Sequence, residues 1–141
     1  MRQLLSLCLV VLFTASSFTP ANDDESKAGI QFTSARWADI LKKAKAENKL
    51  IFLDAYASWC GPCKMLQKNV FTQKTVGDYF NKKFINVKMD MEKGEGPALA
   101  QMYPLEAYPT LLFINGNGRV VKKAIGYMSA DDLIGVGKSV K

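Results

Sequence analysis

A buried strand that leads directly into a helix restricts the fold of this chain most strongly. Leu50 to Tyr56 is a compact apolar run broken only by Asp54, and it has the length of a fully buried strand. Shortly afterwards Cys60 begins a helix, because Pro62 is tolerated only in a helix's first turn. This order indicates an α/β fold.

Apolar periodicity and turn residues predict the remaining elements. We expect helices over about 34–46, 75–80 and 97–103 and after residue 129, with Ser34 and Ser129 as N-caps of the first and the last. Strands are expected over 84–89, 110–114 and 120–125, and the turn at residues 115–118 makes the last two a hairpin. The first two strands, joined through helices, should run parallel. Together these elements predict a mixed four-stranded sheet with helices on both faces.

The composition limits the chemistry. The 141 residues suffice for one domain with its own core. The chain has no histidine, so it lacks the commonest general base and the commonest nitrogen ligand for metals. The net charge of +6 is spread over lysines without an Arg-rich stripe, and we therefore expect no nucleic-acid partner.

The N-terminus has the pattern of a secretory signal peptide. Arg2 precedes an apolar run, Leu4 to Phe13, which small or polar residues follow. The run is too short to span a membrane, which takes about 20 apolar residues. Cleavage after Ser17 or after Ala21 fits the pattern; a buried N-terminal helix or an uncleaved anchor is the alternative. Lipidation at Cys8 is disfavoured because the apolar stretch continues beyond it.

The predicted domain organisation follows from this terminus. We expect a signal peptide over 1–21, a polar and flexible leader over 22–29, and one domain over 30–141. A signal peptide places the mature protein in the periplasm or outside the cell.

Once the signal peptide is removed, Cys60 and Cys63 are the cysteines that remain. Two cysteines do not form a disulfide scaffold in a domain of this size, and their spacing suggests a redox pair. A zinc site would need two more ligands, which neither histidine nor another mature cysteine supplies. A structural disulfide and a metal-binding thiol pair are the alternatives.

The helix start suits a nucleophilic cysteine. Unpaired backbone N–H groups and the positive end of the helix dipole favour the thiolate of Cys60, the attacking species in disulfide exchange. Cys63 lies about one turn further on, so its sulfur can reach back to Cys60. We expect Cys63 to be the more buried, resolving thiol, with Gly61 and Pro62 shaping the turn between them.

Two stretches of the chain resemble thioredoxins. Residues 50–65, LIFLDAYASWCGPCKM, are similar to their active-site segment, and residues 107–113, AYPTLLF, to their cis-proline loop. Residues 43–49 and 71–90 are more similar to secreted bacterial thioredoxin-like proteins, which include the C-terminal domain of a membrane electron-transfer protein that reduces periplasmic partners. The resemblance covers about 30–141. It implies a thioredoxin-like fold and thiol–disulfide oxidoreductase activity, with a redox-active disulfide and no other cofactor or metal.

The resemblance also implies catalytic roles for two charged residues. Asp54 matches the family's buried aspartate behind the redox pair. Burial should raise its pKa, so that it could accept the proton of Cys63 during resolution. The alternative is an aspartate at a strand end that bonds the backbone. Lys88 matches a lysine near that aspartate, and its alternative is a solvated strand lysine.

Substrate contacts are implied for Trp59, Gly61, Pro62, Tyr108 and Pro109. Pro109 should follow a cis peptide bond, and its loop should lie beside the disulfide. The backbone of Tyr108 would then pair with an extended substrate segment, although ordinary packing is the alternative for its side chain.

These features predict an enzyme that reduces disulfides of protein substrates outside the cytoplasm through Cys60 and Cys63. A membrane electron donor and a monomeric state are expected with it. The Gly-Pro pair resembles reducing members of the family. An oxidase or isomerase is the second reading, and a non-catalytic binding module that uses Trp59 and Tyr108 is the third.

Overall fold

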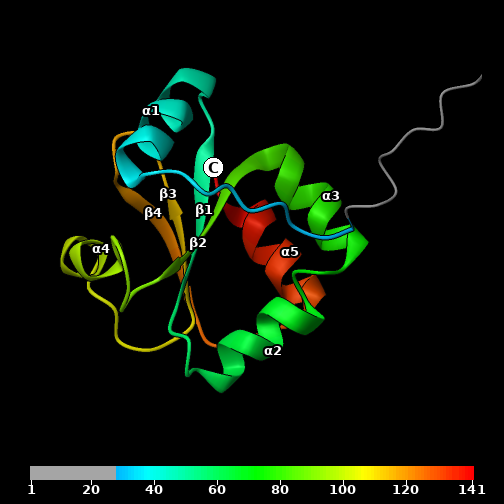
Figure 1. Ribbon diagram of the computed structural model, residues 1–141. Coiled ribbons are helices and arrows are strands. Elements are labelled where there is room, and N and C mark those ends of the chain that lie inside the picture. Colours follow the sequence, from blue (N-terminus) through cyan, green and yellow to red (C-terminus); the bar gives the residue numbers. More distant parts are fainter. Residues whose placement is uncertain (1–27) are drawn as a thin grey trace, which may run out of the picture.

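The computed structural model describes residues 28–141 (Figure 1). The predicted signal peptide, Cys8 and the leader up to residue 27 lie outside the described residues. None of the helices within 28–141 has the length and apolar character that a membrane crossing requires. The elements follow in the order α1 (Trp37–Glu47), β1 (Leu50–Tyr56), α2 (Gly61–Asn69), α3 (Lys74–Lys83), β2 (Phe84–Asp90), α4 (Gly96–Met102), β3 (Thr110–Ile114), β4 (Val120–Ile125) and α5 (Ala130–Ser139).

The four strands form one mixed sheet in the order β2-β1-β3-β4. Strand β1 lies in the middle, parallel to β2 and antiparallel to β3, and β4 pairs antiparallel with β3 at the other edge. This arrangement confirms the predicted mixed sheet. Because β1 is central, whatever follows its carboxyl end is positioned by strands on both sides.

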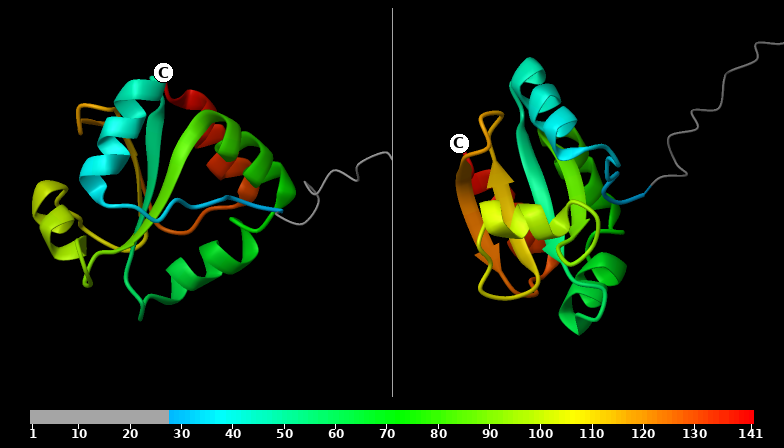
Figure 2. Two further views of the ribbon diagram at one scale, coloured as in Figure 1. Left: turned by 45° about the horizontal axis from the view of Figure 1, so that its top comes forward. Right: turned by 60° about the vertical axis from the view of Figure 1, so that its left-hand side comes forward.

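Helices cover both faces of the sheet (Figure 2). Helices α1 and α4 pack on one face, over alternate residues of β1 such as Ile51 and Leu53. Helices α2, α3 and α5 pack on the other, over an aromatic cluster that includes Phe52, Phe80 and Phe113. Successive strand residues point to opposite faces, so Asp54 shares its face with Phe52 and lies toward α2. The thioredoxin-like fold is thereby confirmed.

The chain before α1 packs along the edge of the sheet. The N–H of Ile30 donates to the carbonyl of Phe71 (2.7 Å), and that of Thr33 donates to the carbonyl of Asn86 in β2 (2.8 Å). Gly29, which the sequence pattern assigns to the flexible leader, is buried. It has a φ of 91°, and its carbonyl accepts a hydrogen bond from Asn81. This residue is therefore packed against the domain.

Helix α1 begins later than Ser34 suggests. Its N-cap is Arg36, whose side chain makes no capping bond, and the first helical residue is Trp37. The N–H of Trp37 instead donates to the Glu95 carboxylate, 3.0 Å away. The prediction of Ser34 as N-cap was wrong because a residue far along the chain satisfies this helix start.

Candidate active site

The two cysteines lie where β1 leads into α2. Cys60 is the N-cap of α2, and its Sγ accepts a hydrogen bond from the backbone N–H of Cys63 at 3.2 Å. A disulfide joins the two residues, whose Cα atoms are 5.3 Å apart. Cys60 is 3% and Cys63 1% exposed, so burial hardly separates them in this oxidised state. Tyr56 and Tyr108 pack against the pair.

Asp54 lies on β1 beneath this helix and is fully buried. Burial raises its pKa from 3.8 to about 7, although a hydrogen bond from Gln67 and the charge of Lys88 both act to lower it. Gln67 Nε2 donates to Asp54 Oδ2 at 3.2 Å, whereas Oδ1 has no partner among the described residues. Such a carboxyl group can gain and lose a proton near neutral pH.

Lys88 lies opposite Asp54 in the register of β1 and β2. Its side chain is exposed, and its Nζ lies 5.5 Å from the centroid of the Phe32 ring. No ion pair with Asp54 occurs within the described part of the chain. Lys88 therefore acts on Asp54 only as a charge at a distance.

Of the predicted contact residues, Trp59, Gly61 and Pro62 are exposed and Tyr108 is half-buried, whereas Pro109 is buried. Trp59 is 67% exposed, and its ring meets that of Tyr108 edge to face with the centroids 5.9 Å apart. We call Trp59, Gly61, Pro62 and Tyr108 the contact surface.

Two acidic residues that the sequence analysis did not single out border this surface. The indole N–H of Trp59 donates to Glu92 Oε2 at 3.0 Å. The backbone N–H of Glu92 donates to Asp90 and is the main cause that lowers the pKa of that carboxyl. Burial raises the pKa of Tyr108, and the charges of Glu92 and Asp90 raise it further. Both carboxylates thus lie close enough to influence the contact surface.

The loop before β3 places Pro109 beside this surface. The Tyr108–Pro109 peptide bond is cis, the isomer that the resemblance to thioredoxins implies. The Thr110 hydroxyl donates to the carbonyl of Ala107 (2.7 Å), and the N–H of Gly126 donates to that of Pro109 (2.8 Å). These bonds tie the loop to the hairpin.

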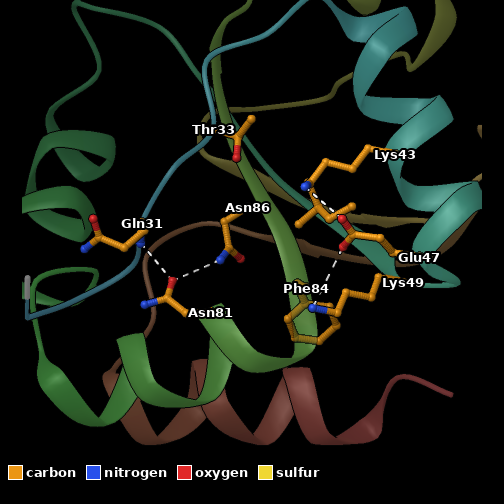
Figure 3. A pocket seen from close by; sticks show the side chains of 9 residues that line it. Gln31, Thr33, Lys43, Glu47, Lys49, Asn81, Phe84 and Asn86 are labelled. Carbon is orange, nitrogen blue, oxygen red and sulfur yellow. Dashed lines mark hydrogen bonds and ion pairs between the residues drawn. The ribbon is translucent and has the colours of Figure 1, made fainter. Parts of the chain in front are cut away.

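A polar hollow lies at the opposite end of the central strands (Figure 3). It has a volume of about 220 Å³, and Lys49, which directly precedes β1, lines it with Phe84 at the start of β2. Some of its polar groups pair with one another, as Lys43 does with Glu47 at 2.8 Å. Because Cys60 follows the other end of β1, this hollow is separate from the disulfide.

Metal ligands do not gather in the described part of the chain. Within residues 28–141, no group of three or more His, Cys, Asp or Glu residues could hold a metal ion.

The sequence of this chain is similar to those of thioredoxin-like proteins, in agreement with the geometry of the site. The sequence model of a family described as "Thioredoxin-like domain" matches residues 37–141. Thioredoxin H4 of Arabidopsis thaliana is 37% identical over 99 residues, which cover 70% of this chain and 78% of that protein. The thiol:disulfide interchange protein DsbD of Haemophilus influenzae is 28% identical over 84% of this chain, but the matched part is only 21% of DsbD.

Solved structures show the same likeness. The solution structure of a candidate disulphide-isomerase from Bacteroides thetaiotaomicron has a TM-score of 0.70 and 50% identity. The alignment covers 79% of this chain and 92% of that one. The oxidised C-terminal domain of DsbD from Neisseria meningitidis has a TM-score of 0.63 at 23% identity, with 79% and 99% covered, and supports the fold alone.

Proposed function

The chain belongs to the thioredoxin-like domain family, and on that premise we propose that it reduces disulfide bonds of proteins outside the cytoplasm. It is a thiol–disulfide oxidoreductase whose redox group is the Cys60–Cys63 disulfide. One observation carries the proposal: the Cys60–Cys63 disulfide lies at the start of α2, next to the exposed Trp59, and Gln67 of the same helix bonds the buried carboxyl group of Asp54.

The reaction proceeds in two exchanges. In the reduced protein, the thiolate of Cys60 attacks a substrate disulfide, forms a mixed disulfide and releases one substrate thiolate. Cys63 then loses its proton to Asp54 and attacks the sulfur of Cys60. The Cys60–Cys63 bond forms, the bond to the substrate breaks, and the second substrate sulfur leaves as a thiolate that takes a proton from water. Two electrons pass from the protein to the substrate.

The remaining site residues bind the substrate or affect the ionisation of Asp54. Trp59, Gly61, Pro62 and Tyr108 contact the substrate, and the loop that holds Pro109 offers backbone groups to an extended segment beside the disulfide. Lys88 favours the ionised form of Asp54 through its charge.

The reducing direction rests on the sequence between the cysteines. Gly61 and Pro62 resemble the pair found in reducing members of the family. The relative named DsbD is a thiol:disulfide interchange protein, and a membrane donor of this kind would return the oxidised chain to its dithiol form. This chain spans only 21% of that relative, so the donor is inferred from one part of it.

An isomerase or oxidase is the second candidate, because the Bacteroides protein that shares 50% identity is described as a candidate disulphide-isomerase. The reduction potential of the Cys60–Cys63 couple separates the two. A value near about −270 mV, as in thioredoxin, supports reduction. A value between about −180 and −120 mV, as in isomerases and strong oxidants, contradicts it.

Trapping tests whether the chain reacts with protein disulfides. Cys63→Ser retains the attacking thiol and removes the resolving one, so it should accumulate mixed disulfides with periplasmic proteins through Cys60. Cys60→Ser is the matched control and should trap nothing. Adducts that form equally in both variants, or in neither, would contradict the proposed role.

Location and assembly form the last part of the proposal. The predicted signal peptide over 1–21 supports export, and the mature chain is expected to act as a monomer. Fractionation of cells that express the full chain should recover a shortened protein outside the cytoplasm. A protein of full length in the cytoplasm would contradict export, and sedimentation at micromolar concentration would reveal a dimer.

A further inference from the structure

Gln67 lies where it can act on the buried carboxyl group behind the disulfide. It follows Cys63 by four residues on α2, so the two side chains lie on the same face of that helix, one turn apart. Cys63 is almost fully buried on this face, whereas Gln67 is half-buried. The Gln67 side chain reaches down to β1, where its Nε2 meets Asp54 Oδ2 at 3.2 Å.

The hydrogen bond from Gln67 makes the two carboxyl oxygens of Asp54 unequal. Oδ2 accepts the amide N–H of Gln67, while Oδ1 is fully buried and has no partner among the described residues. A buried oxygen without a donor is unfavourable in the folded protein and offers a place for a proton. Because the carboxyl group can rotate, Oδ1 and Oδ2 would exchange roles if nothing held one of them.

We propose that Gln67 is a positioning residue for the redox reaction: its amide holds Oδ2 of Asp54 and leaves Oδ1 to take the proton of Cys63. This rests on the proposed resolving step. The side-chain amide of Gln67 donates to Asp54, whereas the donor to Cys60 Sγ is the backbone N–H of Cys63, so Gln67 acts through Asp54. A donor to the carboxylate also favours the ionised form, so Gln67 keeps the base available near neutral pH.

The variant Gln67→Met tests this, because methionine has a similar length and a good helix propensity but no N–H to donate. We expect the pKa of Asp54, measured by titration of its ¹³Cγ resonance in the oxidised protein, to rise by about one pH unit. Gln73→Met is the matched control, since the Gln73 side chain is exposed and donates to the carbonyl of Asn69 instead. It should leave the pKa of Asp54 unchanged. An unchanged pKa in Gln67→Met would overturn the proposal.

The resolving step supplies a second readout. Reduced protein is mixed with a synthetic peptide that holds one disulfide, quenched with acid and alkylated, and the decay of the Cys60 mixed disulfide is followed by mass spectrometry. In Gln67→Met the pH of half-maximal resolution should move up by the same unit. Resolution near pH 7 should then be about fivefold slower, because the ionised fraction of Asp54 falls from about a half to about a tenth.

Asp54→Asn provides the reference background. The pH dependence that Asp54 provides is absent there, so adding Gln67→Met should change nothing further. A further change of similar size would show that Gln67 acts by another route and would contradict the proposal. If Cys63→Ser forms no mixed disulfide with any peptide, the proposed function fails, while the titration of Asp54 still decides on Gln67.

Discussion

At the scale of single residues, the buried carboxyl group of Asp54 makes the stability of the folded protein depend on pH. Asp54 ionises near 3.8 in the unfolded chain, whereas burial raises its pKa to about 7 in the folded protein. Between these two pH values the folded state keeps a proton that the unfolded state has released. The free energy of unfolding therefore falls as the pH rises through this window. Above the window, the folded protein bears the full cost of burying the ionised carboxylate of Asp54.

Replacing Asp54 with asparagine removes this penalty. Near pH 8 the oxidised Asp54→Asn protein should be more stable than wild type by up to about 4 kcal/mol, and near pH 4 the two should differ little. Urea unfolding at both pH values measures the difference. Asp78→Asn, which alters an exposed carboxylate, is the control and should show no such change with pH. Equal stability of Asp54→Asn and wild type near pH 8 would mean that the carboxylate is accommodated without penalty.

The sequence alone could identify the redox pair, because Cys60 and Cys63 stand where a predicted strand runs into a helix. The resemblance to thioredoxins added Asp54 in the same segment and Pro109 in a later loop. Gln67 and Glu92 could not be found this way. Each acts through a hydrogen bond to a residue 13 or 33 positions away, and only the folded sheet and helix bring the partners together.

At the scale of single elements, α5 shows how a local signal fixes a helix start. The N–H of Asp132 donates to Ser129 Oγ at 3.2 Å, and the Ser129 hydroxyl donates to the Asp132 carboxylate at 2.7 Å. One turn into the helix, Leu133 is fully buried in the core beside α3. The cap therefore supports an element that covers one face of the sheet.

Loss of this cap should be measurable. Ser129→Ala should lower the free energy of unfolding by about 1 kcal/mol, because the first turn loses its side-chain acceptor. Ser139→Ala is a matched control at the other end of α5, where the hydroxyl donates to the carbonyl of Val136. It should change stability by less than about 0.5 kcal/mol. Urea midpoints of the two variants make the comparison, and equal effects would contradict a capping role.

Local signals predicted most elements but not every boundary. The strands over 110–114 and 120–125 agree with β3 and β4, since a turn rich in Asn and Gly fixes both inner ends. Helix α1 begins two residues later than an N-cap at Ser34 predicts, because Glu95 from the loop before α4 supplies the acceptor at its start. The residues around the start of α1 do not indicate that a carboxylate distant in sequence will bond there.

At the scale of the whole molecule, residues 28–36, which we call the N-terminal segment, pack against the rest of the domain. These residues run along β2 and α3 without forming a helix or strand, so the sequence has no hydrophobic periodicity that predicts where they pack. Their anchor is a close approach of two backbones, Gly29 against Gly77 of α3. A Cβ atom at Gly77 would overlap the carbonyl of Gly29. Only a residue without a side chain fits there.

Gly77→Ala should therefore displace the N-terminal segment. We expect a loss of about 1–3 kcal/mol of stability, together with faster hydrogen exchange at the amides of Ile30 and Thr33. Gly135→Ala is the control, because a Cβ atom at that position of α5 meets nothing within 4 Å. It should instead stabilise the helix by about 0.5–1 kcal/mol. Unchanged exchange at Ile30 in Gly77→Ala would show that the segment is held by other contacts.

The point where this segment joins the domain also has a practical meaning. Ile30 bonds to Phe71, just beyond the end of α2, whereas Cys60 lies at the beginning of the same helix (Figure 1). Nine helical residues separate the two positions, a length of about 13 Å. An affinity tag or a solid support attached ahead of residue 28 would therefore be joined at the far end of α2, away from the disulfide. An immobilised form of the protein could then capture large folded clients from a flowing extract.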